Sequence, residues 1–272
     1  MAREQPVDIL IIGDAHAKPG VPNDRFEWAG RFAAERCPDV IVDMGDWEDM
    51  PSLSAYDVGK KSYEGRTYKA DLEAAWEARE LFNKGLNSFD GEYEPLKVAL
   101  GGNHAEGRLA RVLEEDRKLE GTLSVDDFRH KDYGWLYVPY RQPCDIAGFT
   151  FCHYFVSGVM GRPIGGEMPS LQLIRKQLTS CIAGHSHLFD IAHRTKPDGS
   201  RVWGIVAGCF LDRDQWEDYA NAANLLWWRG LVLLKGCQGG DFESIETVTV
   251  EQLEDMYGAQ TKRSRKRRNQ RH

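Results

Sequence analysis

Five short groups of polar residues in this sequence carry side chains that bind metal ions or move protons, and each follows an apolar run. Five of the eight histidines fall in these groups. The ligands on offer are carboxylates, an amide and imidazoles, with no thiolate, and this mix favours Mn, Fe, Zn or Ni over a cysteine-bound structural zinc. The groups are Asp14-Ala15-His16, Gly45-Asp46-Trp47-Glu48-Asp49, Gly102-Asn103-His104, His153 and Gly184-His185-Ser186-His187.

The spacing within these groups indicates how they could share a centre. Asp14 and His16 are two residues apart, as are His185 and His187. In extended chain, residues i and i+2 point to the same side, so each pair can reach one metal or two adjacent ones. A carboxylate such as Asp46 could then bridge two metals. Two metals about 3.5–4 Å apart can clamp a phosphate and hold a hydroxide between them, because metal binding lowers the pKa of water from about 15.7 towards neutrality.

Each group taken alone also has an ordinary structural explanation. An Asp-x-His pair arises by chance, and a single buried histidine is commonly a hydrogen-bonded core residue. Gly102-Asn103-His104 could form a turn, because Asn tolerates left-handed backbone geometry. All five groups in order, each at the end of a predicted strand, favour chemistry over coincidence.

The elements that must position these groups begin with a βαβ unit. The apolar runs at 7–13 and 39–44 predict two buried strands. Between them, residues 23–36 predict an amphipathic helix that begins at Asn23 or Asp24 and ends before Pro38. Such a unit implies a parallel strand pair with a right-handed crossover. The acidic group at 45–49 therefore follows the carboxyl end of a strand, where open α/β sheets bind ligands.

The rest of the chain continues as an α/β pattern that becomes richer in strands. Residues 50–68 lack periodicity and predict a long loop. Further strands are predicted at 96–100, 149–155 and 180–183, and antiparallel strands at 188–196, 201–210 and 225–235. Further helices are predicted at 69–88, 107–119 and 171–178.

Composition places this pattern in one large domain. A chain of 272 residues with 42% hydrophobic residues suits a single α/β domain, predicted over 1–258. The sequence shows no apolar run of about 18 residues and no signal peptide, so no membrane partner is expected. The six cysteines are scattered without a C-x-x-C pair, which predicts reduced thiols in a cytoplasmic protein.

The charge is distributed unevenly along the chain. Residues 262–271 contain seven Lys or Arg and no acid, while the whole chain carries −7, so the remainder carries −14. We expect residues 259–272 to form a disordered basic tail that could touch DNA or RNA. A solvated terminus without a partner is the alternative.

The ordered set Asp-x-His, Gly-Asp-x-x-Asp, Gly-Asn-His, lone His and Gly-His-x-His resembles the calcineurin-like metallophosphoesterases. The resemblance covers residues 7 to about 210. It implies a two-sheet β-sandwich flanked by helices in αββα layers, and a hydrolase that uses two divalent ions, with Mn as the first expectation. It also implies that Asp46 bridges the two metals, that Asp14, His16 and His187 hold one of them, and that Asn103, His153 and His185 hold the other.

The same resemblance implies roles for two residues that would not bind metal. His104 would protonate or stabilise the leaving oxygen, and Asp49 would orient His104. Two departures from the family pattern stand out. Met50-Pro51 replaces the Arg-Gly of the phosphoprotein phosphatases, which makes a protein phosphatase less expected. Ala105 stands where the family usually has Glu or Asp, so a contact around the centre would be missing. The loop 50–69 is similar to segments of bacteriophage-encoded members.

Three functions remain open on the sequence. The first is a phosphodiesterase acting on nucleic acid or a nucleotide, with tyrosines of the loop stacking bases. Its predicted phosphate contacts are Lys60, Lys61, Arg66 and Arg162. A solvated loop is the alternative for the first three, and the acidic body argues for a small substrate such as a cyclic nucleotide. The second function is a phosphomonoesterase, and the third is a metal-bearing scaffold. The presence of both His104 and Asp49 argues against a scaffold.

Overall fold

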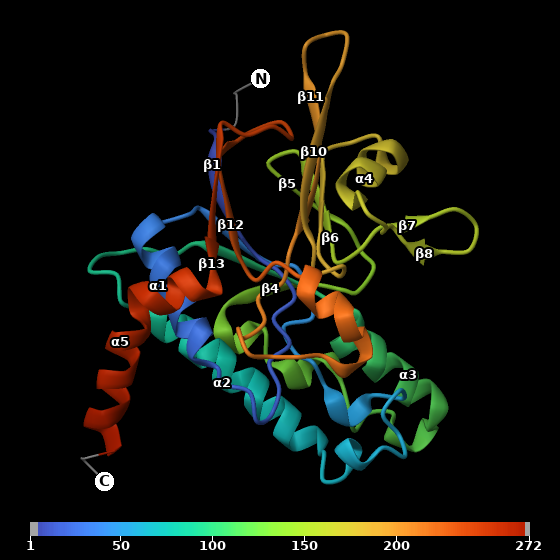
Figure 1. The fold of residues 1–272 in the computed structure, drawn as a ribbon, viewed down its shortest axis with the longest axis vertical. Coiled ribbons are helices and arrows are strands. Elements are labelled where there is room, and N and C mark those ends of the chain that lie inside the picture. Colours follow the sequence, from blue (N-terminus) through green and yellow to red (C-terminus); the bar gives the residue numbers. More distant parts are fainter. Residues whose placement is uncertain (1–4, 270–272) are drawn as a thin grey trace.

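Two main β-sheets pack against each other, and helices cover their outer faces (Figure 1). The computed structural model describes the backbone of residues 5–269 and the side chains of residues 5–259. The protein is thus a mixed α/β structure with two main mixed sheets and helices, as the sequence predicts at this level. In the described part of the chain, no helix is long and apolar enough to cross a membrane. All six cysteines are free thiols, as expected.

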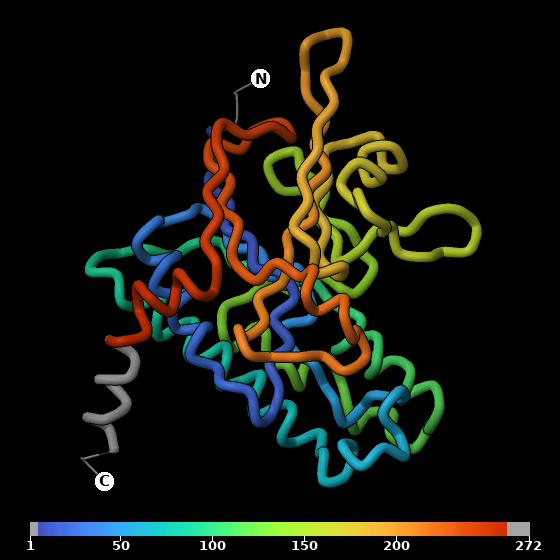
Figure 2. Tube along the Cα trace, in the orientation of Figure 1, coloured from blue at the N-terminus to red at the C-terminus, as the bar shows by residue number. Residues whose placement is uncertain are grey.

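The first sheet has six strands in the order β13-β12-β1-β2-β3-β4. Its strands are β1 (Val7–Ile12), β2 (Val40–Asp43), β3 (Leu96–Leu100), β4 (Trp135–Val138), β12 (Gly230–Cys237) and β13 (Ser244–Thr249). Strands β1 to β4 pair in parallel, which confirms the predicted βαβ arrangement. β12 returns late in the chain to pair antiparallel with β1 (Figure 2).

The second sheet has five strands in the order β10-β11-β9-β6-β5. Its strands are β5 (Cys144–Ile146), β6 (Phe149–Cys152), β9 (Cys181–Ala183), β10 (Phe189–Thr195) and β11 (Arg201–Ala207). β6 and β9 are parallel, with Cys152 opposite Ala183. The residues that follow these two strands, His153 and Gly184, therefore lie side by side. A small hairpin of β7 (Val156–Ser157) and β8 (Arg162–Pro163) projects away from the sheets (Figure 1).

The helices pack through apolar faces that match the alternation of the central strands. Ile9 and Ile11 of β1 face the second sheet, whereas Leu10 and Ile12 face the helices, so β1 is buried on both sides. The helices against this outer face are α1 (Asp24–Arg36), α2 (Tyr68–Leu86) and α5 (Val250–Asn269). α4 (Pro169–Gln177) packs on β9, β10 and β11, and α3 (Arg108–Glu115) follows the third polar group.

Several elements differ from the sequence-based expectations. Strands β4, β5 and β13 and helix α5 were not expected; β4 and β5 are short, with three or four residues each. The strand expected at 225–235 begins only at Gly230, because a 3₁₀ segment, η7 (Asp218–Leu226), precedes it. The loop 50–68 contains short helical turns, η1 (Pro51–Leu53) and η2 (Lys61–Tyr63). The other turns are η3 (Asn103–Gly107), η4 (Arg117–Leu119), η5 (Val125–Phe128) and η6 (Lys131–Tyr133).

The predicted basic tail at 259–272 falls almost entirely outside the residues whose side chains are described. Helix α5 is anchored earlier, where the Tyr257 hydroxyl donates to Glu35 of α1 at 2.8 Å. The domain boundary at 258 and the behaviour of the tail stay predictions.

Candidate metal centre

The five polar groups meet at one edge of the paired sheets. The backbone N–H groups of Ala15 and His16 donate to Asp46 O at 3.1 and 2.9 Å, which joins the groups after β1 and β2. The His104 N–H donates to Asp46 Oδ1 at 2.7 Å, which adds the group after β3. The His185 N–H donates to Asp14 Oδ1 at 2.9 Å, which brings in the group after β9. The sequence therefore predicted correctly that these groups come together.

The first cluster consists of Asp14, His16 and His187, each of which offers a ligand atom within 4.8 Å of the other two. His187 Nε2 is 3.1 Å from Asp14 Oδ2. Both ring nitrogens of His16 lack a hydrogen-bond partner although this side chain is 0% exposed. Buried polar atoms are nearly always hydrogen-bonded, so unpartnered imidazole nitrogens beside a carboxylate are suited to a cation.

The second cluster consists of Asp46, His153 and His185. His153 donates from Nδ1 to Met44 O at 2.9 Å, which directs Nε2 into the cluster. There Nε2 lies 2.9 Å from Asn103 Oδ1 and 3.3 Å from Asp46 Oδ2. The same Asp46 oxygen is 3.9 Å from His16 Nε2. Asp46 thus lies between the two clusters and is close to a histidine of each.

The carboxylates and imidazoles of the centre shift one another's pKa values. Burial alone would raise the pKa of Asp14, but His153 and His187 lower it to about 2. Burial would likewise raise the pKa of Asp46, yet His153 and His104 hold it below its usual range. Burial and the nearby His153 lower the pKa of His185 to about 4. Burial would lower the pKa of His153, but Asp46 and Asp14 raise it to about 10, so its imidazole holds a proton that a bound divalent ion would displace.

The backbone of the centre adopts conformations that L-residues avoid. His16, Asp46, His185 and His187 have φ values of 45, 55, 66 and 61°. Such left-handed residues cost free energy and concentrate at functional sites. Two glycines allow the close approach: a Cβ on Gly102 would meet Asp46 Oδ1 at 2.0 Å, and one on Gly184 would meet Asp14 Oδ1 at 2.6 Å.

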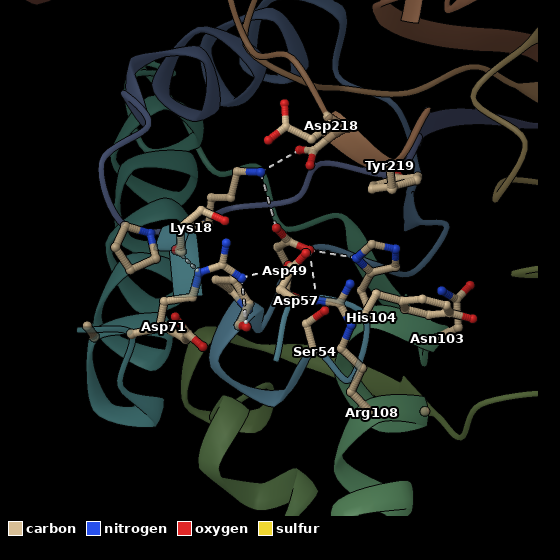
Figure 3. A pocket seen from close by; sticks show the side chains of 18 of the residues that line it. Lys18, Asp49, Ser54, Asp57, Asp71, Asn103, His104, Arg108, Asp218 and Tyr219 are labelled. Carbon is tan, nitrogen blue, oxygen red and sulfur yellow. Dashed lines mark hydrogen bonds and ion pairs between the residues drawn. The ribbon is translucent and has the colours of Figure 1, made fainter. Parts of the chain in front are cut away.

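His104 belongs to a hydrogen-bonded network in which lysine and arginine side chains already pair with the Asp49 carboxylate (Figure 3). Its Nδ1 lies 2.6 Å from Asp49 Oδ1. Asp49 also pairs with Arg108 Nη1 at 3.1 Å and with Lys18 Nζ at 3.3 Å. Although His16, Asp49 and His104 form a third group with metal-binding geometry, these two cations neutralise its carboxylate. The contacts fit an orienting role for Asp49 better than metal ligation.

Trp47 and Glu48, which lie between Asp46 and Asp49, anchor the loop to the outer helices. Arg79 of α2 donates from Nη2 to Asp43 Oδ2 at 3.0 Å and to Glu48 Oε1 at 3.1 Å. Its guanidinium lies 4.2 Å from the centroid of the fully buried Trp47 ring. This buried network fixes both ends of the turn that presents Asp46.

A cavity of about 1030 Å³ opens beside the centre. Its lining includes Asn103, His104 and His185, together with parts of the segments 54–71 and 216–219. Lys18, Asp49 and Arg108 also line it and are drawn in Figure 3. Substrate entering this cavity would meet the centre from its solvent side.

The four cations predicted from sequence to bind phosphate are placed unevenly. Arg66 lines the cavity but pairs with Asp57 at 2.8 Å. Lys60 and Lys61 are exposed and are not among the cavity-lining residues, and Lys60 also pairs with Asp57. Arg162 is exposed on β8, away from the lining. Their role as substrate contacts stays a prediction.

Several residues around the centre are not among those predicted from the sequence. Lys18 follows His16 by two residues and Arg108 follows His104 by four, so strand and helix spacing could have indicated both. Glu217, which binds Lys18 Nζ at 2.5 Å, comes from the distant segment before η7. No local pattern marks Glu217, because only the tertiary fold brings it to this site.

A scan against models of known families finds none that matches the chain, and a search of curated proteins finds no match. The assignment of this centre therefore depends on its own geometry.

Proposed function

We propose that the protein is a dinuclear-metal phosphodiesterase of the calcineurin-like metallophosphoesterase type that hydrolyses nucleic acid or nucleotides. The observation that carries the proposal is the position of Asp46 between two buried clusters, one of which contains a histidine with no partner on either ring nitrogen. Most buried polar atoms in proteins are hydrogen-bonded, so two unpartnered ring nitrogens beside the Asp46 carboxylate support metal ligation by His16.

The metal ligands follow from the clusters. Asp46 would be shared, and two divalent ions, with Mn as the first candidate, would supply Lewis-acid activation of a phosphate and a water molecule of lowered pKa. The remaining ligands would be Asp14, His16 and His187 for one ion and Asn103, His153 and His185 for the other.

His104 is the proposed acid for the leaving group. Because Asp49 accepts a hydrogen bond from Nδ1, the proton that His104 can transfer resides on Nε2. Burial alone would raise the pKa of Asp49, but the bond to His104 and the charge of Lys18 keep it well below the usual range. Asp49 therefore stays ionised at neutral pH and stabilises the imidazolium form that donates the proton.

The cavity supports a diester rather than a small monoester. Its volume of about 1030 Å³ is at the upper limit of the roughly 300–1,000 Å³ typical of small-molecule sites. A substrate with groups on both sides of the reacting phosphate fits such a space. A phosphomonoesterase remains the alternative, and the substrates chosen below separate the two.

The test is a hydrolysis panel with chelator-treated protein reloaded with Mn. It compares bis(p-nitrophenyl) phosphate, single- and double-stranded DNA, RNA, cyclic nucleotides and a nucleoside monophosphate. We expect diester cleavage that depends on added metal and disappears in Asp46→Asn. Hydrolysis of the monophosphate alone would establish the phosphomonoesterase, and two bound metals without hydrolysis of any substrate would leave a scaffold.

A further inference from the structure

The cations that line the cavity differ in one respect: most are already paired with a carboxylate. Arg141 also lines the cavity and is exposed, but among the described residues no carboxylate lies within ion-pair distance of its guanidinium. The paired cations and their partners are Lys18 with Glu217, Arg66 with Asp57, Arg108 with Asp49 and Arg111 with Glu115.

Arg141 is held in place although its charge is not neutralised. Its Nε donates to the Tyr154 hydroxyl at 3.1 Å, and its guanidinium lies 5.0 Å from the centroid of the Tyr140 ring. The two tyrosine hydroxyls are 2.7 Å apart. Glu106 of η3 fixes the segment further, since it accepts the Tyr140 backbone N–H at 2.6 Å. A cation held through one nitrogen keeps its other N–H groups for a ligand.

The backbone at Arg141 favours a different residue. Arg141 is the third residue of a turn closed by the Gln142 N–H donating to Pro139 O at 3.0 Å, and its φ is 66°. Turns with positive φ at this position favour Gly or Asn. An arginine that tolerates this strain beside a candidate active site points to a role for its side chain.

The contacts of Tyr154 place Arg141 next to the second metal cluster, not inside it. The Tyr154 ring lies 4.9 Å from the His185 ring and 5.7 Å from the His153 ring, measured between centroids. Arg141 reaches this cluster through Tyr154 and through Tyr140, whose ring centroid lies 6.3 Å from that of His153. An anion bound by Arg141 would therefore lie beside a phosphate held at the metals.

We propose that Arg141 binds a second phosphate, adjacent to the reacting one, and that the substrate is accordingly a nucleotide chain or a nucleotide with phosphates on both sides of its sugar. This inference rests on the proposed function for the position of the reacting phosphate. Two exposed aromatic residues of segment 216–219 also line the cavity and offer stacking surfaces for a base. They are Trp216, 51% exposed, and Tyr219, 54% exposed.

The test measures binding by calorimetry with Mn present. Thymidine 3′,5′-bisphosphate is compared with thymidine 5′-phosphate and with thymidine 3′-phosphate, so that either end of the sugar can occupy the metals. Wild-type protein should bind the bisphosphate on the order of tenfold to a hundredfold tighter than the better monophosphate, because a charge-assisted contact is added. Arg141→Gly should remove this preference, and Arg141→Lys should keep part of it.

The glycine variant also separates recognition from structure. Because glycine suits the positive φ, Arg141→Gly should melt at the same or a higher temperature than wild type. Arg175→Gln, on the exposed end of α4, is the matched control and should keep the full preference. Equal affinity of wild type for bisphosphate and monophosphates would overturn the proposal, as would a loss in Arg141→Gly that affects all three ligands alike.

Hydrolysis of bis(p-nitrophenyl) phosphate, which has a single phosphate, is measured in parallel. If it is cleaved but the bisphosphate preference is absent, the second-phosphate site is wrong and the phosphodiesterase stands. If the bisphosphate preference is present and no diester is cleaved, the second-phosphate site stands and the phosphodiesterase assignment is wrong.

Discussion

Two buried groups of acidic residues lie near the turn at Gly45, and they differ in the source of the positive charge that faces them. Asp43 and Glu48 face the guanidinium of Arg79, which is itself 0% exposed. Asp14 and Asp46, by contrast, form ion pairs only with histidines among the described residues. The group of Asp43, Glu48 and Arg79, called the Arg79 cluster below, carries its own permanent cation, whereas the carboxylates of the candidate metal centre lack one.

On the proposed function, this difference separates a structural cluster from one that binds metal. The nitrogens of Arg79 that make no hydrogen bond, Nε and Nη1, belong to a guanidinium stacked on Trp47 and Trp135, so its charge meets aromatic faces. The unpartnered nitrogens of His16 instead face carboxylates across a gap of 3.9 Å. Substitutions in the two clusters should therefore have different consequences: loss of metal and activity in one, loss of stability in the other.

The largest effect is expected for Asp46→Ala. Removing the carboxylate between the clusters should empty both metal positions, and diester hydrolysis should fall by about 10³-fold or more. Metal analysis after dialysis and bis(p-nitrophenyl) phosphate turnover measure the two results. Glu48→Gln, two residues away in the group that faces Arg79, is the control and should retain both metals. Two metals still bound to Asp46→Ala would show that the bridging assignment is wrong.

His104→Ala should have the next largest effect while leaving the metals in place. Loss of a leaving-group acid should slow cleavage of a dinucleotide, whose leaving group is poor, by roughly 10²–10⁴-fold. Bis(p-nitrophenyl) phosphate should be affected much less, because nitrophenolate leaves without a proton. Exposed His193 on β10 provides the control His193→Ala. Equal turnover of the dinucleotide by His104→Ala and wild type would remove His104 from the mechanism.

How much of this centre could be predicted from sequence depends on whether a residue follows a strand directly. Asp14, Asp46 and Asn103 come two or three residues after the ends of β1, β2 and β3, so hydrophobic runs locate them and parallel pairing brings them together. His153 and His185 follow β6 and β9 in the same way. Local pattern and sheet topology agree for all five, which is why the prediction of their proximity holds.

Residues whose position depends on tertiary packing could not be found in this manner. Glu217 and Arg141 reach the cavity from irregular segments, where neither periodicity nor a flanking strand fixes a direction. The phosphate contacts predicted in loop 50–69 depend on charge, yet Lys60 and Arg66 share the carboxylate of Asp57. Sequence shows that charges exist, but their pairing is decided by the fold.

Arg79→Met tests the Arg79 cluster, formed by Asp43, Glu48 and Arg79. The substitution leaves two buried carboxyl groups without their cation, so unfolding of the metal-free protein should become easier by about 3–5 kcal/mol. Urea unfolding measures this, with exposed Arg175→Met as the control. Metal affinity should fall by no more than about 10–100-fold, as for a residue that supports ligands from behind. Metal loss as complete as in Asp46→Ala would mean that the two clusters form one functional unit.

The smallest effect concerns the proton held between the buried carboxyl groups of Asp43 and Glu48. Burial raises the pKa of Asp43 to about 7; Arg79 opposes this shift and the neighbouring Glu48 adds to it. Between its usual pKa of about 3.9 and about 7, the folded protein therefore keeps a proton that the unfolded chain loses. Stability should accordingly decrease as pH rises through this window and level off above it. Asp43→Asn cannot lose that proton, so its stability relative to wild type should improve by about 3 kcal/mol between about pH 4.5 and about pH 8. Urea unfolding of both metal-free proteins at the two pH values measures this difference. A difference that does not change with pH would place the proton on Glu48, whose pKa burial also raises, and would make Asp43 the ionised partner of Arg79.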